Sequence, residues 1–210
     1  MPITANEVLA AAERWGLLRT LPGPETGAEQ LASYSSLLLH WNTRLALTAI
    51  RDEAELIERH LMEGVFAAEH HPSGILALDF GSGTGVPGIP IAICREDLQI
   101  TLAESQRKKA AFLQEIVRVL GLKAVVHSGR AETLARGTFD AVWMRAVEKS
   151  ATMLPLAATL VAAGGSLCLL GTGITPPIGA SSAEEPVSWQ WKTLPLPGSK
   201  DRVLHIGQRM

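Results

Sequence analysis

The chain of 210 residues is long enough for one sizeable domain, and 47% hydrophobic with 19% charged residues excludes a disordered or fibrous protein. Two cysteines, Cys94 and Cys168, exclude a disulfide framework and a four-thiolate zinc site, and both lie in apolar runs that predict core positions. The net charge of −2 divides into −5 over residues 1–74 and +3 over residues 75–210, a basic excess that permits a polyanionic partner without indicating one.

The first 70 residues predict helices, because apolar residues recur there at spacings of three and four. The pattern covers residues 8–15, 31–41 and 55–70, and the turn-rich segment LPGPETG separates the first two helices. The N-terminus carries acidic residues early and lacks the basic and apolar segments of a signal peptide. We expect residues 1–72 to form a helical cap within the same domain as a core of residues 73–210.

From residue 75 onward, short apolar runs alternate with helical segments. The expected helices are 89–94, 106–122, 131–134 and 153–163, and the expected strands are 75–80, 99–104, 123–128, 139–146 and 164–171. A loop-like segment over 172–186 precedes two further strands at 187–196 and 201–208. Such an alternation predicts an α/β fold with a doubly wound, mostly parallel, seven-stranded sheet that carries helices on both faces.

An apolar stretch over residues 151–170 is the one candidate for a membrane span. Pro155 and the glycine pair at 164–165 divide it into a helix, a turn and a strand, so we expect no membrane segment. The cysteine usage suits a reducing compartment, and a cytoplasmic location is expected.

The glycine-rich loop after the first strand carries the strongest functional signal. Asp79 ends the strand, and Gly81, Gly83 and Gly85 alternate with other residues before Gly88, so the backbone turns tightly and a ligand approaches it without Cβ obstruction. Loops at this position bind dinucleotides in one class of sheet and S-adenosylmethionine in another. The Asp79 carboxylate suits a cationic amine better than a pyrophosphate, which favours S-adenosylmethionine. A nicotinamide-dependent dehydrogenase is a poorer alternative, because we find no set of hydride-handling residues.

Two further strand ends carry candidate ligand-binding residues. Glu104 ends the second strand 23 positions after Gly81, where an acidic side chain meets ribose hydroxyls in such sheets. Ser105 is expected to cap the helix that follows. After the third strand, backbone groups of residues 130–132 or the Glu132 carboxylate are placed to meet an adenine edge. The alternatives are a solvent-facing glutamate at 104 and an exposed helix start at 130–132.

The chain resembles the bacterial glucose-inhibited division protein B family, the small-subunit ribosomal RNA guanine-N7 methyltransferases. The resemblance runs from about His40 to Gly171 and rests on HWNTRLALTAIRD, ERHLMEG, LDFGSGTGVPGIPIAI, TLAESQRKKAAFLQEI, SGRAE and FDAVWMRAV. It implies a class I, Rossmann-like methyltransferase that uses S-adenosylmethionine to methylate N7 of a guanosine in 16S ribosomal RNA and releases S-adenosylhomocysteine.

The resemblance also implies roles for individual residues and shows three departures. Glu104 stands where the family usually has Asp, Leu170-Gly171 replaces a lysine-glycine pair, and LHIGQRM replaces a lysine-bearing strand. Glu104 is one methylene longer but chemically equivalent, and the two losses of lysine weaken the substrate side more than the cofactor side. The positions that match cofactor-contacting or site-lining residues are Gly81, Val86, Glu104, Ala131, Glu132 and Arg145.

Guanine N7 carries an unprotonated lone pair, so we assign no catalytic acid or base and expect alignment and desolvation to dominate. Arg145 is expected to orient a guanine edge or a phosphate, because a guanidinium donates in a forked geometry. The alternative for Arg145 is a salt bridge to Glu148 or Asp140.

Contact with RNA is expected from basic residues of the N-terminal helical region and of the helix after the second strand. The alternative for the basic residues of the second group is the solvated first turn of that helix. Arg51 and His60 rank first because they lie in segments that resemble the family. Trp41 and Trp143 have the chemistry to stack on bases, but core positions are favoured. The full candidate set is Arg44, Arg51, Arg59, His60, Arg107, Lys108 and Lys109.

The expected partner is 16S ribosomal RNA in the small ribosomal subunit, met by a monomer without a metal. His70-His71 is expected to be a surface helix end, since no third ligand is spaced for a metal. Two alternatives remain open: a methyltransferase acting on another RNA, a protein or a metabolite, and a non-catalytic RNA-binding protein of ribosome assembly.

Overall fold

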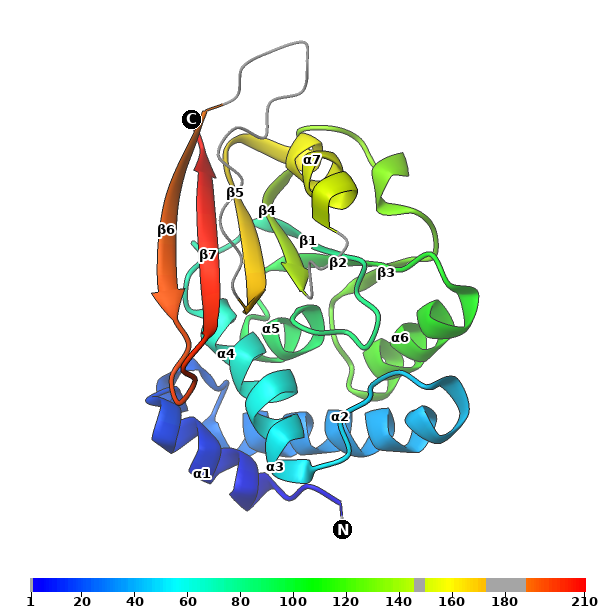
Figure 1. Cartoon of the computed structure of the whole chain (residues 1–210). Coiled ribbons are helices and arrows are strands. Elements are labelled where there is room, and N and C mark those ends of the chain that lie inside the picture. The colour runs from blue at the N-terminus through cyan, green and yellow to red at the C-terminus, as the bar shows by residue number, and fades with distance from the viewer. Residues whose placement is uncertain (1, 146–149, 173–187) are drawn as a thin grey trace.

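A seven-stranded sheet forms the centre of the protein in a computed structural model that describes residues 2–145, 150–172 and 188–210 (Figure 1). The strand order is β3-β2-β1-β4-β5-β7-β6. Strands β1 to β5 are parallel to one another, and β7 is antiparallel to both β5 and β6. The expected mostly parallel, seven-stranded sheet is thereby confirmed. The strands are β1 Leu76–Phe80, β2 Gln99–Ala103, β3 Val125–His127, β4 Phe139–Arg145, β5 Val161–Thr172, β6 Trp189–Pro195 and β7 Arg202–Arg209.

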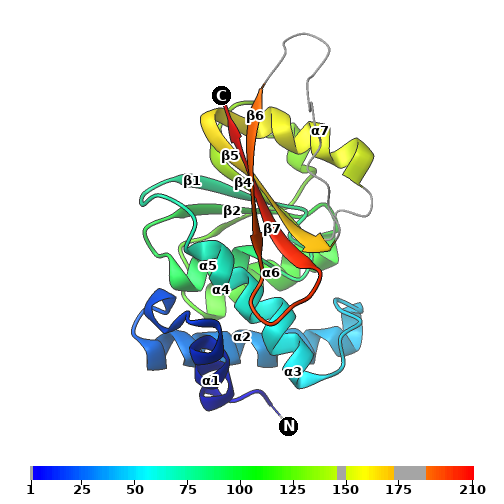
Figure 2. The same cartoon turned by 60° about the vertical axis from the view of Figure 1, so that its left-hand side comes forward.

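Helices cover both faces of the sheet, as expected from the alternating pattern. Figures 1 and 2 show α7 on one face and α4, α5 and α6 on the other, with α1 and α2 forming an outer layer beyond them. Within the described residues, no helix is both long enough and apolar enough to cross a membrane. The helices are α1 Ala5–Trp15, η1 Leu18–Thr20, α2 Pro24–Leu45, α3 Glu53–Leu56, the π-helical η2 Ile57–Met62, α4 Glu63–Ala68, α5 Gly88–Cys94, α6 Arg107–Val119, η3 Ala131–Thr133 and α7 Ser150–Leu160.

Two expected boundaries were wrong. Helix α2 begins at Pro24, inside the segment predicted as a separator, because proline fits the first helical turn, where an N–H has no helical partner. Helix α7 ends at Leu160 rather than 163, since Val161 already pairs with Phe139 of β4. The register between β4 and β5 then shifts before Ala141 pairs with Ser166. Strand β5 therefore has more residues between these two pairings than β4 has.

The N-terminal helices and the sheet share one hydrophobic core. Leu31 of α2 and Leu61 of η2 belong to the same buried cluster as Ile100 of β2 and Trp143 of β4. A second cluster lies on the α7 face and includes Val142, so neighbouring residues of β4 point to opposite faces. The division into a cap and a core stays a prediction, while the packing joins the two parts in one interior.

The sequence predicted some buried side chains and missed others. Cys94 and Cys168 are buried, which confirms their core positions. Trp143 is fully buried and confirms its expected core role, whereas Trp41 is partly buried. The surface position expected for His71 was wrong: only 8% of it is exposed, and the Trp143 indole N–H donates to its Nε2 at 2.7 Å.

Candidate functional site

The glycine-rich loop leaves the carboxyl end of β1 and leads into α5. Its backbone is fixed by the Ser82 N–H, which donates to the Ala103 carbonyl of β2 at 2.9 Å, and by the Ser82 hydroxyl, which donates to the Asp79 carbonyl at 3.0 Å. The buried Tyr34 of α2 donates its hydroxyl to the Thr84 carbonyl at 2.8 Å. The N-terminal helical layer thus holds the loop directly.

The four glycines of the loop divide into two pairs with different physical roles. A Cβ on Gly85 would lie 2.6 Å from Ile89 Cγ1, and a Cβ on Gly88 would lie 2.4 Å from Leu102 Cδ2, so these two glycines permit close internal packing. Among the described residues, a Cβ at Gly81 would meet nothing within 4 Å and a Cβ at Gly83 only the Gly81 carbonyl at 3.7 Å; the φ angles are 74° and 55°. Gly85 also has a positive φ, of 91°, so what distinguishes Gly81 and Gly83 is the open space beside their left-handed backbone.

Asp79 is buried beneath this loop rather than open to solvent, with 1% exposed. Its Oδ2 accepts the Gly88 N–H at 3.1 Å, which fixes the start of α5. Burial raises the pKa of Asp79 to about 7, against the lowering effects of the Gly88 N–H and of the Arg145 charge. The carboxyl group therefore holds the loop and carries a proton in part of the molecules at neutral pH.

Glu104 follows β2 and turns its carboxylate to the loop. Oε2 accepts the Gly83 N–H at 3.0 Å, and Oε1 accepts the Gln106 N–H at 2.7 Å. These bonds use two of the roughly four acceptor sites of a carboxylate. The cap expected from Ser105 was wrong: Gln106 precedes α6, without a side-chain cap, and Ser105 is exposed.

The end of β3 leads into the short helix η3. Ala131 is 6% exposed while Glu132 is exposed, so this segment offers an apolar contact beside an acidic one. The turn is tied by Thr133, whose hydroxyl donates to the Arg130 carbonyl at 2.7 Å and lies 3.2 Å from His127 Nε2. Because β1, β2 and β3 are parallel neighbours, their carboxyl ends lie at the same edge of the sheet.

Arg145 ends β4, two residues after Trp143, which pairs with Asp79 of β1. Its side chain is 15% exposed, and Nε lies 3.7 Å from the Glu63 carboxylate. The alternative of an ion pair with Asp140 was wrong: Arg145 pairs with Glu63 instead, and Asp140 lies near the other end of β4, where it accepts the Leu76 N–H at 2.9 Å. Residue 148, the other acid considered, lies outside the described residues.

The candidate RNA-binding residues separate by exposure. Arg51, Arg107 and Lys108 are exposed, as is Arg44 at the end of α2. The surface contact expected of His60 is wrong for this structure: the ring is 2% exposed because η2 packs it against the end of β4. Among the described residues, no group of three or more His, Cys, Asp or Glu side chains gathers to hold a metal.

Sequence reasoning missed three residues that organise the site: Tyr34, Glu63 and Arg202. Tyr34 was taken only as part of an apolar helical repeat, although a buried tyrosine hydroxyl needs a partner. Glu63 had a local signal, since it is one acid within the apolar run 61–68. Arg202 carried no local signal, because its partner Glu63 lies 139 positions away.

Comparisons with known proteins agree with the architecture. The family model GidB, described as rRNA small subunit methyltransferase G, matches residues 27–178, more than half of the chain. A protein named ribosomal RNA small subunit methyltransferase G from Xanthomonas axonopodis pv. citri is 40% identical over 174 residues, which cover 82% of this chain and 80% of that protein. One of the same name from Roseiflexus castenholzii is 39% identical over 191 residues, covering 87% and 76%. The chain belongs to the rRNA small subunit methyltransferase G family.

Solved structures show the same fold for this rRNA small subunit methyltransferase G family member. A methyltransferase from Aquifex aeolicus, described as dependent on S-adenosylmethionine, superposes with a TM-score of 0.57 and 15% identity over 79% of this chain and 97% of that chain. The chain is an S-adenosylmethionine-dependent methyltransferase with a Rossmann-like fold. The family match includes Glu63, Glu104 and Arg145, whereas Arg202 lies beyond residue 178.

Proposed function

We propose that this chain transfers the methyl group of S-adenosylmethionine to N7 of a guanosine in 16S ribosomal RNA of the small ribosomal subunit. The observation that carries the proposal is the carboxyl edge of the sheet. There Gly81 and Gly83 border open space beside Glu104, and Arg145 ends the strand next to β1. The names of the relatives support the RNA substrate.

The residues at this edge fit the cofactor. Glu104 keeps acceptor sites for two ribose hydroxyls after binding the loop, and the buried charge of Asp79 favours a cationic ligand. Ala131 offers an apolar surface to an adenine ring. The residues proposed to form the cofactor site, by contact or by shaping the loop, are Asp79, Gly81, Gly83, Gly85, Val86, Glu104, Ser105, Ala131 and Glu132.

Methyl transfer to N7 requires alignment of the reacting atoms rather than proton transfer. S-adenosylmethionine supplies a methyl group bonded to a positively charged sulfur. The guanine N7 lone pair forms the new bond to that carbon as the carbon–sulfur bond breaks, so the chain needs no general base. Its residues hold both partners in line and exclude water. We assign to Arg145 the orientation of a guanine edge or a phosphate, which a forked guanidinium achieves with two donors.

Exposed cations of two separate segments are proposed to hold the RNA backbone. Arg51 follows α2, while Arg107 and Lys108 begin α6. Binding through phosphates predicts that RNA affinity falls as salt is raised. Leu170 stands where the resemblance implies a lysine, and it is buried beside Leu204 of β7, so RNA binding relies on the remaining cations.

Methyl transfer from labelled cofactor tests the function. Purified protein is incubated with radiolabelled-methyl S-adenosylmethionine and either unmodified small subunits or 16S RNA, and the RNA is digested to nucleosides for chromatography. Label in N7-methylguanosine is expected. Label in another nucleoside, a protein or a metabolite overturns the substrate. Weak or absent cofactor binding favours the non-catalytic assembly protein, whereas cofactor binding without transfer to any RNA points to a missing partner or a different acceptor. We further propose a cytoplasmic monomer that needs no metal. Sedimentation checks the oligomeric state, and methyl transfer in the presence of a chelator checks the independence from metal.

A further inference from the structure

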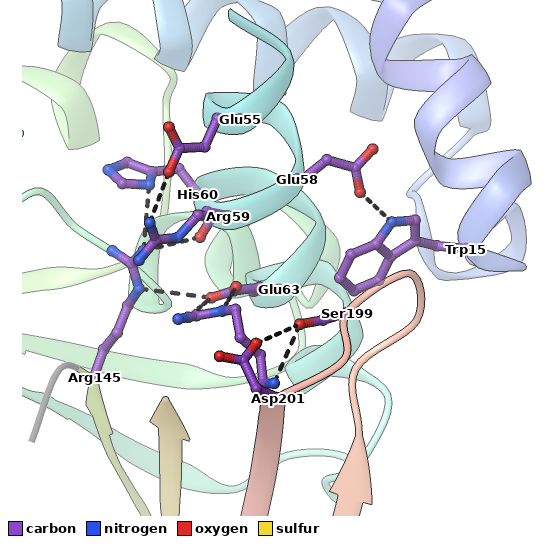
Figure 3. Close-up of polar contacts among 10 residues, drawn as sticks. Trp15, Glu55, Glu58, Arg59, His60, Glu63, Arg145, Ser199 and Asp201 are labelled. Atoms are coloured by element: carbon purple, nitrogen blue, oxygen red, sulfur yellow. Dashed lines mark hydrogen bonds and ion pairs between the residues drawn. The ribbon is translucent and has the colours of Figure 1, made fainter. Parts of the chain in front are cut away.

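A buried ion-pair network joins the C-terminal hairpin to the arginine of the site (Figure 3). Glu63, the first residue of α4, is 2% exposed, and its carboxylate lies between two guanidinium groups. Arg202 of β7 donates from Nε to Oε1 and from Nη2 to Oε2, the latter at 2.6 Å, while Arg145 Nε lies 3.7 Å from Oε2. A carboxylate this deeply buried requires such compensation.

The remaining contacts of the Arg145 guanidinium come from the same helical segment. Its Nη2 donates to the Arg59 carbonyl at 3.1 Å and lies 3.4 Å from His60 Nδ1. Burial and the nearby Arg145, Arg59 and Arg202 charges lower the pKa of His60 to about 3, so the ring is neutral at pH 7. A neutral ring has one nitrogen that accepts from Arg145.

We propose that Glu63 is a positioning residue that orients the Arg145 guanidinium at the carboxyl end of β4, with Arg202 holding Glu63 in place. The inference rests on the proposed function, in which Arg145 meets a guanine edge or a phosphate. Glu63 acts through Arg145, because its carboxylate is buried and faces the Arg145 guanidinium, whereas Arg145 itself ends β4 (Figure 3).

The hairpin places Arg202 by several bonds of its own. The Arg202 N–H donates to Ser199 Oγ at 3.1 Å, and the Arg202 carbonyl accepts the Leu196 N–H at 3.0 Å. Ser199 Oγ in turn donates to Asp201 at 3.3 Å. The turn between β6 and β7 therefore fixes the cation that holds Glu63, which gives these C-terminal strands a part in methyl transfer.

Glu63→Gln tests this role with a matched control. Glutamine keeps the size of the side chain but removes the charge that both arginines need. We expect kcat for RNA methylation to fall about 10- to 100-fold, as misplacement of an orienting group does, with the Kd for S-adenosylmethionine unchanged. Glu58→Gln is the control, because Glu58 lies on the same helical segment and binds Arg14 and Trp15 without contacting Arg145. Its kcat should equal that of the wild type.

A double variant separates positioning from a purely structural role. If Glu63 acts through Arg145, adding Glu63→Gln to Arg145→Ala causes no further loss of kcat, because the two residues work as a unit. Multiplying losses in the double variant would overturn the inference, as would an unchanged kcat in Glu63→Gln alone. Glu63→Asp, which retains the charge on a shorter side chain, should recover part of the activity. A loss of kcat in Glu63→Gln that follows the unfolded fraction in circular dichroism also counts against positioning.

A magnetic resonance measurement keeps this test independent of the substrate. The Nε–H signal of Arg145, assigned by its disappearance in Arg145→Lys, should shift in Glu63→Gln and stay in place in Glu58→Gln. An unmoved signal in Glu63→Gln overturns the orientation. If the wild type methylates no RNA while the signal shifts as expected, the proposed function fails and the ion-pair contact stands.

Discussion

At the scale of single residues, Asp79 links cofactor binding to pH. With its pKa raised to about 7 by burial, the carboxyl group is largely protonated at pH 6. A cationic ligand favours the ionised form, so binding releases a proton. Affinity for S-adenosylmethionine should therefore rise between pH 5.5 and 7.5 by up to about 25-fold, the ratio of the ionised fractions of Asp79 at the two pH values. In Asp79→Asn, calorimetry should show a much flatter dependence. The same pH dependence in both proteins would contradict this role.

The two pairs of loop glycines predict losses of different kinds: overpacking of the interior at Gly88, and loss of cofactor binding at Gly83. Gly88→Ala places a Cβ 2.6 Å from Asp79 Oδ2 and 2.4 Å from Leu102 Cδ2, and overpacking of this kind should lower the free energy of unfolding by about 1–3 kcal/mol. Gly83→Val meets open space, so its unfolding free energy should fall by only about 1–2 kcal/mol from backbone strain at φ of 55°. Cofactor binding should nevertheless be abolished in Gly83→Val. Urea unfolding and calorimetry on both variants check the contrast, and undiminished binding by Gly83→Val would refute the loop assignment.

At the scale of elements, helix α2 supports the cofactor loop through one hydroxyl. Tyr34→Phe removes the donor to the Thr84 carbonyl and leaves the ring in place, so the unfolding free energy should fall by about 1 kcal/mol. The loop should also bind S-adenosylmethionine more weakly, since its carbonyl loses its anchor. Ser36→Ala on the same helix is the control, because the Ser36 hydroxyl bonds only within α2, to the Ala32 carbonyl. Equal cofactor affinity in Tyr34→Phe and the wild type would show that α2 does not position the loop.

Elements formed by local periodicity were predictable, and those set by distant partners were not. The alternation of strands and helices after residue 75 follows from spacing within each segment, and the glycines at alternate positions of the loop indicate a tight backbone turn. The end of α7 depends instead on the pairing of Val161 with Phe139. The burial of His60 and Glu63 depends on Arg145 and Arg202, and the π-helical turn of η2 has no sequence signal that we recognised.

At the scale of the whole molecule, three buried groups make large contributions to the pH dependence of the stability of the fold. Burial lowers the pKa of His60 to about 3 and that of His71 to about 4. Below pH 6.5 both rings therefore bind protons in the unfolded chain but stay neutral in the folded chain. Both terms make stability fall as pH falls from 6.5. Asp79 has the opposite sign, because its raised pKa lets the folded chain bind a proton between pH 3.8 and about 7 that the unfolded chain has released.

The balance of these terms gives a measurable slope. Between pH 5 and 6 the unfolded chain holds nearly two extra protons on His60 and His71, and the folded chain holds about one on Asp79, so the unfolding free energy should rise with pH by about 1 kcal/mol per unit. Asp79→Asn removes the opposing term, and its slope should steepen to about 2 kcal/mol per unit. Urea unfolding at pH 5.0, 5.5 and 6.0 measures both slopes. Parallel lines for the two proteins would mean that Asp79 is ionised in the folded chain and that the positive charge of Arg145 outweighs its burial.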